Sequence, residues 1–280
     1  SFPVMFYRKD VLSELGIKEL PKTWDEFYKL IPVLQRANLT VGMGDTNVMQ
    51  YGVSQAPNFG FVFPSQIFQR GGNFYRDDLN STNFDQEVVI QSFCDWTELY
   101  TQYSLPLEYD MFNRFRTGEM PIAFAAYTTY NQINYAAPEI KGLWGIAPVP
   151  GILYENGSIH REVAATGNSG AIILAKAKDK KSCFKYIEWL TSSQMQATYG
   201  RNIESLMGPA ARYDTANKTA IYELPWSSAE LKILTEQRSY AREVPVVPAT
   251  YYVNREITNA FRRVVLKNQN PRETLILFNR

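Results

Sequence analysis

The feature that most constrains the fold is a run of five residues without a polar side chain, IAFAA at 122–126. A short, continuous apolar run of this kind is typical of a strand buried on both faces, as in a parallel α/β sheet. A polar segment that Asp110 can cap as a helix, and that ends at Gly118, precedes the run. Hydroxyls, a tyrosine and two amides, TTYNQ at 128–132, follow it directly. We therefore expect a buried strand that delivers polar side chains to one edge of a sheet.

Strand-like and helix-like segments alternate along the rest of the chain. Short extended or apolar segments predict further strands at 5–7, 51–53, 143–147 and 171–174. Helical spacing of apolar residues and capping signals predict helices that begin near 24, 85, 110, 184, 226, 257 and 271, the one near 184 ending at Gly200. This alternation predicts an α/β fold with a mainly parallel sheet.

Two polar or aromatic segments follow predicted strands at the end where ligands bind in open α/β sheets. The segment 128–132 follows the apolar run, and the aromatic segment 58–63 follows the strand expected at 51–53. Aromatic faces can stack on apolar or sugar-ring surfaces, while hydroxyls and amides fix the orientation of a ligand. The two segments either line a shared crevice or are ordinary solvated loops, and periodicity favours neither interpretation.

Composition and charge argue against several classes of function. The net charge is +1 over 280 residues, so no strong field draws the chain to nucleic acid or to an anionic membrane. His160 is the only histidine, and no glycine-rich phosphate loop is present. The acidic pairs at 25–26 and 77–78 lie in predicted caps and turns, whereas a glycosidase needs two carboxylates across a cleft. We expect no enzymatic activity, no cofactor and no metal site.

The two cysteines say little about the compartment. Cys94 and Cys183 each lie in a helical pattern near apolar neighbours, which favours two buried free thiols over a disulfide. The presence of two cysteines is compatible with an extracellular protein and with an intracellular one.

Several segments, in their order along the chain, resemble the extracellular solute-binding proteins of bacterial ABC transporters, the family that includes maltodextrin-binding proteins. They are YRKDVL at 7–12, PKTWDE at 21–26, FRTGEMPI at 115–122, WGIAPVPG at 144–151 and SGAI at 169–172. The segments 113–122, 211–217 and 242–248 resemble more closely the long Gram-positive members. The resemblance implies a two-lobed, type II periplasmic-binding-protein-like α/β fold in which the first part of the N-terminal lobe is missing.

The resemblance also implies a division of the chain between the lobes. The expected parts are a hinge strand and crossover at 1–20, lobe two at 21–147, a crossover at 148–162, a partial lobe one at 163–217 and the rest of lobe two at 218–280. In such a fold the two lobes close on the solute.

The function implied is that of a solute-binding domain of an ABC importer, with a carbohydrate, most simply an oligosaccharide, in the cleft. The expected partners are permease subunits in the membrane, and the expected location is extracellular, on the cell surface of a Gram-positive bacterium as a lipoprotein. A non-transport extracellular binding or sensor module with the same fold is the alternative.

The side chains expected to contact the solute are aromatic or amide groups near the two crevice segments and the last crossover. They are Asn58, Phe59, Phe61, Tyr127, Tyr130, Asn131, Trp226, Tyr251 and Tyr252. We expect one of Tyr251 and Tyr252 to face the cleft and the other the core, because adjacent residues of an extended chain point in opposite directions. Ordinary core packing is the competing interpretation for Phe61 and Tyr130.

Overall fold

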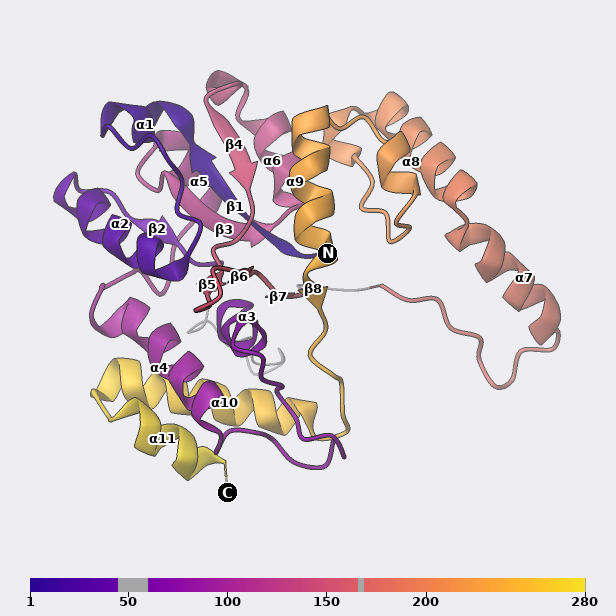
Figure 1. Ribbon diagram of the computed structural model, residues 1–280. Helices are drawn as coiled ribbons and strands as arrows, with labels where there is room; N and C mark the ends of the chain where they lie inside the picture. The colour runs from indigo at the N-terminus through magenta and orange to yellow at the C-terminus, as the bar shows by residue number, and fades with distance from the viewer. Residues whose placement is uncertain (45–59, 166–168, 280) are drawn as a thin grey trace.

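The central sheet has four strands in the order β2-β3-β1-β4 in a computed structural model that describes residues 1–44, 60–165 and 169–279 (Figure 1). The strands are β1 (Pro3–Arg8), β2 (Val41–Gly42), β3 (Ile122–Ala126) and β4 (Trp144–Ala147). β1 runs antiparallel to β3 and to β4, and β2 pairs with β3 in parallel. The prediction of a mainly parallel sheet is therefore wrong here, because an apolar run reports burial of both faces and not the direction of the neighbouring strands.

Both faces of this sheet are covered by side chains from helices. The register places Met5 opposite Phe124, and Phe124 packs 5.3 Å from the ring of Phe27 on one face. On the other face, Phe6 lies 6.4 Å from Phe115 and 6.2 Å from Trp144. Burial on both faces explains why the segment 122–126 contains no polar residue.

Helices surround the sheet and extend the molecule away from it. Along the first part of the chain they are α1 (Lys9–Glu14), α2 (Trp24–Arg36), α3 (Val62–Gln69), α4 (Glu87–Thr101), α5 (Met111–Thr117), α6 (Thr129–Ala136) and the 3-10 turn η1 (Pro138–Ile140). Along the second part they are α7 (Lys180–Thr191), α8 (Ser193–Met207), α9 (Ser228–Ser239), α10 (Thr250–Lys267) and α11 (Pro271–Phe278), with the 3-10 turns η2 (Pro209–Ala211) and η3 (Ala220–Glu223). No described helix is both long enough and apolar enough to cross a bilayer.

Local sequence signals explain several of these boundaries. The capping box predicted at Thr23 and Glu26 is present at the start of α2. Asp110 caps α5, and Gly118 ends it with φ of +88°, a conformation that glycine adopts without strain. The helix predicted to begin near Asp85 begins two residues later, at Glu87, and Asp85 forms an ion pair with Arg76 instead of capping the helix. The strand predicted at 51–53 lies outside the described residues.

Among the described residues, two small sheets of two strands each lie outside the central sheet. The strands involved are β5 (Ile152–Leu153), β6 (Ile159–His160), β7 (Val163–Ala164) and β8 (Ala241–Arg242), with β5 antiparallel to β6 and β7 parallel to β8. Gln69 of α3 is fully buried beside them, and its amide donates to the carbonyls of Pro150 and Glu162. The Gln69 side chain also accepts a hydrogen bond from the indole of Trp24, so one amide joins α2, α3 and the crossover.

The C-terminal helices return to the first half of the chain. Phe261 of α10 stacks on Trp96 of α4 at 4.2 Å, and α11 packs beside both helices (Figure 1). The C-terminal helices therefore pack against a helix from the first half of the chain.

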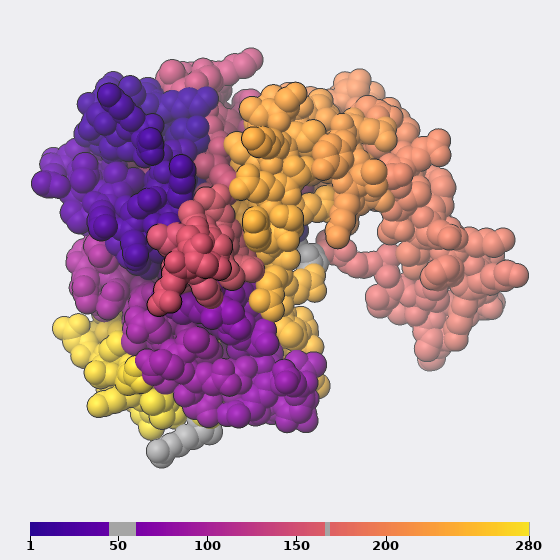
Figure 2. All heavy atoms as spheres, viewed as in Figure 1, coloured from indigo at the N-terminus to yellow at the C-terminus, as the bar shows by residue number. Residues whose placement is uncertain are grey.

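Residues 169–191, called the arm below, project from the rest of the molecule (Figures 1 and 2). No residue of α7 is buried, and the exposed fractions of Phe184 and Trp189 are 61% and 51%. The prediction of a strand at 171–174 is wrong: these residues pair with no strand among the described residues, and Ile172 is 80% exposed. The helix expected to end at Gly200 is instead two helices, α7 and α8, and α8 continues through Gly200 to Met207. Glycine fits at position 200 because a Cβ atom there would clash with Leu224.

Candidate functional site

The polar segment that follows β3 begins a helix, and the helix places three of the predicted ligand residues together. Tyr127 lies between β3 and α6, while Tyr130 and Asn131 lie in the first turn of α6. Residues three and four apart share one face of a helix, so these three side chains point toward the same neighbours. Those neighbours are the segment 212–214 and the residues at the start of α9.

Tyr127 is buried between the two halves of the chain. Its ring stacks on Phe2 at 4.7 Å, and its hydroxyl donates a hydrogen bond to the carboxylate of Asp214. Burial and the negative charge of Asp214 raise the pKa of Tyr127 well above its usual value. The phenol is therefore a neutral hydrogen-bond donor at any physiological pH.

Tyr130 and Trp226 form the aromatic part of the site. Their rings lie 4.9 Å apart at an angle of 66°, and the Arg212 guanidinium lies over both, 4.6 Å from the Trp226 ring and 5.5 Å from the Tyr130 ring. The Tyr130 hydroxyl donates to Oε1 of Glu230 at 2.5 Å. Burial, together with this carboxylate, raises the pKa of Tyr130 to about 12.

Arg212 is held in place by the carboxylate of Glu204 and by a hydrogen bond to its backbone carbonyl. Its guanidinium contacts Glu204 through two nitrogens, with the Nη2–Oε1 distance at 2.8 Å, and both side chains are largely buried. The carbonyl of Arg212 accepts a hydrogen bond of 2.8 Å from the amide of Asn131. Although burial lowers the pKa of Arg212, its hydrogen bonds and ion pair with Glu204 raise it overall.

Two buried polar atoms of this cluster have no hydrogen-bond partner among the described residues. They are the side-chain oxygen Oδ1 of Asn131 and the indole nitrogen Nε1 of Trp226. Leaving a buried donor or acceptor unsatisfied costs about 1–3 kcal/mol. One acceptor and one donor without partners, next to two aromatic rings, are the groups that a hydroxyl-bearing ligand or a water molecule would satisfy.

The other predicted ligand residues do not join this cluster. Phe61 is 4% exposed and packs 6.0 Å from Phe124, so the described contacts are those of a core residue. Tyr251 and Tyr252 lie in the first turn of α10, 52% and 59% exposed. The expectation that one of them faces the core is wrong, because the chain is helical there and neither ring is covered. Asn58 and Phe59 lie outside the described residues.

Trp144 of β4 is 8% exposed and is part of the core.

Sequence reasoning missed Glu230 and Asp214. Glu230 belongs to the capping box that Ser227 begins at the N-terminus of α9, where its Oε2 accepts from the Ser227 amide. Its other oxygen, Oε1, accepts from the Tyr130 hydroxyl. The sequence signal SSAE at 227–230 marks the helix start, but it does not show which side chain approaches from α6. Asp214 carries no local signal, since its partner lies 87 residues away.

The described residues contain no group of three or more histidine, cysteine or acidic side chains that could hold a metal ion. Cys94 and Cys183 are free, and both are half-buried. The candidate site is therefore a set of aromatic rings, amides, carboxylates and one guanidinium, a set suited to binding through stacking and hydrogen bonds.

The sequence profile of the bacterial extracellular solute-binding proteins matches residues 1–197 of the chain. The chain belongs to this family. A protein of Brucella abortus (strain 2308) that is named as a binding protein is 22% identical over 279 residues, which are 95% of this chain and 61% of the relative. The chain spans about three fifths of the length of the curated relatives that it matches.

Solved structures with the same fold include sugar-binding proteins. The sugar-binding protein MalE of Xanthomonas citri has a TM-score of 0.76 and 21% identity, and the match covers 99% of this chain and 67% of that chain. A solute-binding protein of a Thermotoga lettingae ABC transporter, solved with α-D-tagatose, has a TM-score of 0.71 and 17% identity, with 99% and 68% covered. The two-lobed type II binding-protein fold is thereby shown, with about a third of each solved chain outside the match.

Proposed function

We propose that the chain is the larger part of a carbohydrate-binding protein that delivers its solute to an ABC importer. The observation that carries this proposal is the cluster of Tyr127, Tyr130, Asn131 and Trp226 at the end of β3, with an unpaired acceptor and an unpaired donor inside it. A sugar hydroxyl donates and accepts at once, and a sugar ring stacks on aromatic faces. The family and the sugar-binding structures of the same fold support this choice of solute.

The contacts of the cluster cross the boundary expected between the lobes. Tyr127 and Asn131 lie in the segment assigned to lobe two, whereas Arg212 and Asp214 lie in the segment assigned to lobe one. Separation of these two segments would expose the aromatic rings and the unpaired atoms to a solute. The solute would then favour the state in which it contacts both segments, by its differential affinity for that state.

Thermal unfolding in the presence of oligosaccharides tests the proposal. Maltotriose and other short oligosaccharides are added to the 280-residue chain, to Tyr130→Phe and to Tyr135→Phe. Tyr135 lies on the same helix and is 65% exposed, so it serves as the matched control. A ligand at a hundred times its dissociation constant stabilises the native state by about 2.7 kcal/mol, which raises the melting temperature by several degrees.

We expect a rise in melting temperature for one class of sugar, a smaller rise in Tyr130→Phe and an unchanged rise in Tyr135→Phe. A rise that is equal in all three proteins would place the sugar elsewhere. The absence of any rise, in this chain and in a chain extended to the length of its relatives, would contradict carbohydrate binding.

The partners and the location follow from the family resemblance. We propose that permease subunits of the membrane receive the loaded protein and that a lipid anchor attaches it to the surface of a Gram-positive bacterium. Fractionation of the native cells, with and without detergent, tests the anchor. Recovery of the protein from the culture medium without detergent would contradict attachment.

A binding or sensor module without transport is the second candidate, and one observation favours it. The hydroxyls of Tyr127 and Tyr130 already donate to Asp214 and Glu230, so much of the polar capacity of the cluster is used within the protein. Uptake of a labelled sugar that binds in the thermal assay separates the two functions. Loss of uptake on deletion of the protein supports transport, and unchanged uptake supports the sensor.

A further inference from the structure

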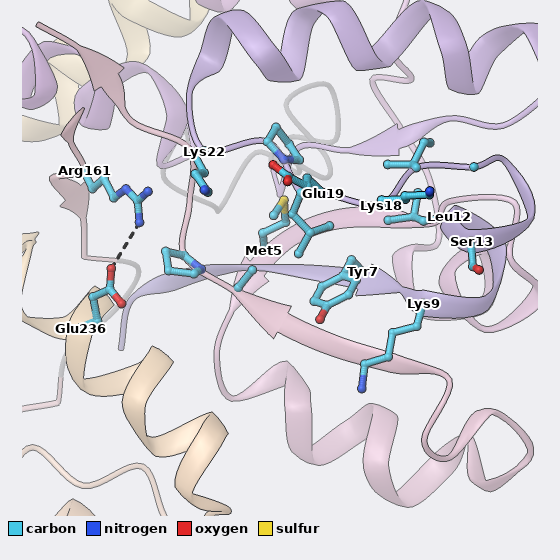
Figure 3. A pocket seen from close by; sticks show the side chains of 16 residues that line it. Met5, Tyr7, Lys9, Leu12, Ser13, Lys18, Glu19, Lys22, Arg161 and Glu236 are labelled. Carbon is cyan, nitrogen blue, oxygen red and sulfur yellow. Dashed lines mark hydrogen bonds and ion pairs between the residues drawn. The ribbon is translucent and has the colours of Figure 1, made fainter. Parts of the chain in front are cut away.

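A hollow lies on the sheet, away from the aromatic cluster. It has a volume of about 770 Å³ and is bounded by β1, by α1 and the loop that follows it, by the end of β4 and by Arg161 and Glu236 (Figure 3). None of the residues of the cluster at the end of β3 lines it. We call this hollow the β1 groove.

The walls of the β1 groove are fixed by backbone contacts. The loop after α1 is tied at its start, where the amide of Ile17 donates to the carbonyl of Leu12 at 2.9 Å. It is tied at its end, where the amide of Gly151 donates to the carbonyl of Lys22 at 3.0 Å. A groove with both rims anchored is formed before a ligand arrives, which is typical of small-molecule sites.

Gly145 shapes the floor of the groove. A Cβ atom at this position would lie 3.0 Å from the Tyr7 ring and hydroxyl and 3.1 Å from Cε of Lys9. The absence of a side chain lets Tyr7 and Lys9 lie across the edge strand β4 and line the groove (Figure 3). Burial raises the pKa of Tyr7, so its hydroxyl remains a donor.

Cationic side chains lie toward both ends of the groove. Lys9 and Lys18 lie toward one end, and Lys22 and Arg161 toward the other (Figure 3). Arg161 pairs with Glu236 at 3.2 Å, whereas the described carboxylates form no ion pair with the three lysines.

Between these ends the lining is mostly apolar, with a single carboxylate. Met5, Leu12 and Leu20 supply the apolar surface, and Glu19 supplies the carboxylate. The lining as a whole holds four cationic side chains and two carboxylates, which leaves an excess of positive charge.

We propose that the β1 groove binds an elongated organic dianion, with an acidic group at each end and an apolar body between them. Lys18 and Lys22, at opposite ends of the groove, are four residues apart, so their Cα atoms lie at most about 14 Å apart. A molecule of that length can place one carboxylate or phosphate near Lys9 and Lys18 and the other near Lys22. Its body would then lie on the apolar floor.

Calorimetric titration with α,ω-dicarboxylates, from succinate to sebacate, tests this assignment on the 280-residue chain. We expect affinity to rise with length toward the long members, and octanoate, which has one carboxylate, to bind more weakly than the dicarboxylate of equal length. Lys9→Gln and Lys22→Gln should each weaken binding by about two- to fivefold, the range for a partly exposed ion pair. Glu19→Gln should tighten it, because the replacement removes a repulsive charge.

The control is Lys29→Gln, since Lys29 is an exposed lysine of α2 outside the groove. Equal weakening in this variant would show attraction to net charge alone and would overturn the proposal. An affinity independent of chain length, or no heat at millimolar dicarboxylate, would also overturn it. These outcomes are independent of sugar binding at the end of β3, because the two sites share no residue.

Discussion

Arg212 lies between two aromatic rings and a buried carboxylate, and each of these contacts depends on the others. Its charge offsets that of Glu204, its guanidinium covers Trp226 and its backbone accepts from Asn131. A guanidinium is suited to this position, because it is planar, stacks on aromatic faces and donates through two nitrogens to one carboxylate.

Removal of Arg212 should therefore be costly. Arg212→Ala leaves Glu204 buried without a counter-charge, and the loss of one partner of a buried pair costs about 3–5 kcal/mol. Urea unfolding measures the change. Arg201→Ala is the control, since its pair with Glu223 is half exposed and should be worth at most about 1 kcal/mol. A similar small loss in both variants would contradict a structural role for the buried pair.

The raised pKa of Tyr130 predicts how the free energy of unfolding changes at high pH. Its pKa is raised to about 12 in the folded protein, so the folded state binds the phenolic proton more tightly than the unfolded state. This contribution to stability is complete below pH 10 and is lost as the pH rises from 10 to 12. Because the residue is half-buried, solvent screening reduces the effect to about 1 kcal/mol.

Guanidinium unfolding of the wild type and of Tyr130→Phe, measured between pH 9 and 12, tests whether this stability is lost as the pH rises. The difference in free energy of unfolding between the two proteins should narrow as the pH rises. A difference that widens for Tyr130→Phe would mean that the phenolate is stabilised by folding.

At the scale of elements, local signals in the sequence predicted some helix ends, although not those near Asp85 and Gly200, and predicted strand pairings poorly. The cap at Thr23, the cap at Asp110 and the glycine end at Gly118 are set by residues within one turn of each other. The direction of β1 relative to β3 depends on residues more than 100 positions apart, and no periodicity reports it. The segment 171–174 shows the same limit, since its apolar pattern is that of a strand but the described residues provide no partner strand.

The arm should behave as an exposed apolar surface. Its helix α7 has 12 residues and none of them is buried, and helices of this length are marginally stable on their own. The 280-residue chain should therefore bind an apolar dye such as ANS, and Phe184→Ser with Trp189→Ser should reduce the fluorescence strongly. The free energy of unfolding should change by no more than about 0.5 kcal/mol, as for other surface substitutions.

Leu153→Ser provides the control for the arm, because Leu153 is 57% exposed on the β5–β6 hairpin and lies outside it. This variant should leave dye binding nearly unchanged. Dye binding that persists after both substitutions in the arm would place the exposed apolar surface elsewhere.

For the whole molecule, the sequence placed Tyr127, Tyr130 and Asn131 after a buried strand, but it did not show which residues gather around them. Trp226 lies beside Tyr127 and Tyr130, whereas Phe61, which was expected to share their crevice, packs in the core. The partners of Tyr127 and Asn131 in the segment 212–214 lie more than 80 residues away and form contacts only once the second half of the chain has folded back. Folding therefore joins the two segments that the proposed lobes contribute.

The hydrogen bonds between these segments should hold the unliganded protein in a compact state. Tyr127→Phe combined with Asn131→Ala removes the bonds to Asp214 and to the Arg212 carbonyl, while the ring of residue 127 still packs on Phe2. The population of open molecules should then rise, because each lost bond removes about 0.5–1.5 kcal/mol that favours the compact state. Small-angle X-ray scattering should show a larger radius of gyration than for the wild type, and a bound sugar that bridges the segments should restore the smaller value. Gln132→Ala, on the exposed side of the same helix, should scatter like the wild type. An unchanged radius of gyration in the double variant would mean that other contacts fix the arrangement, and that the segments at the end of β3 do not separate.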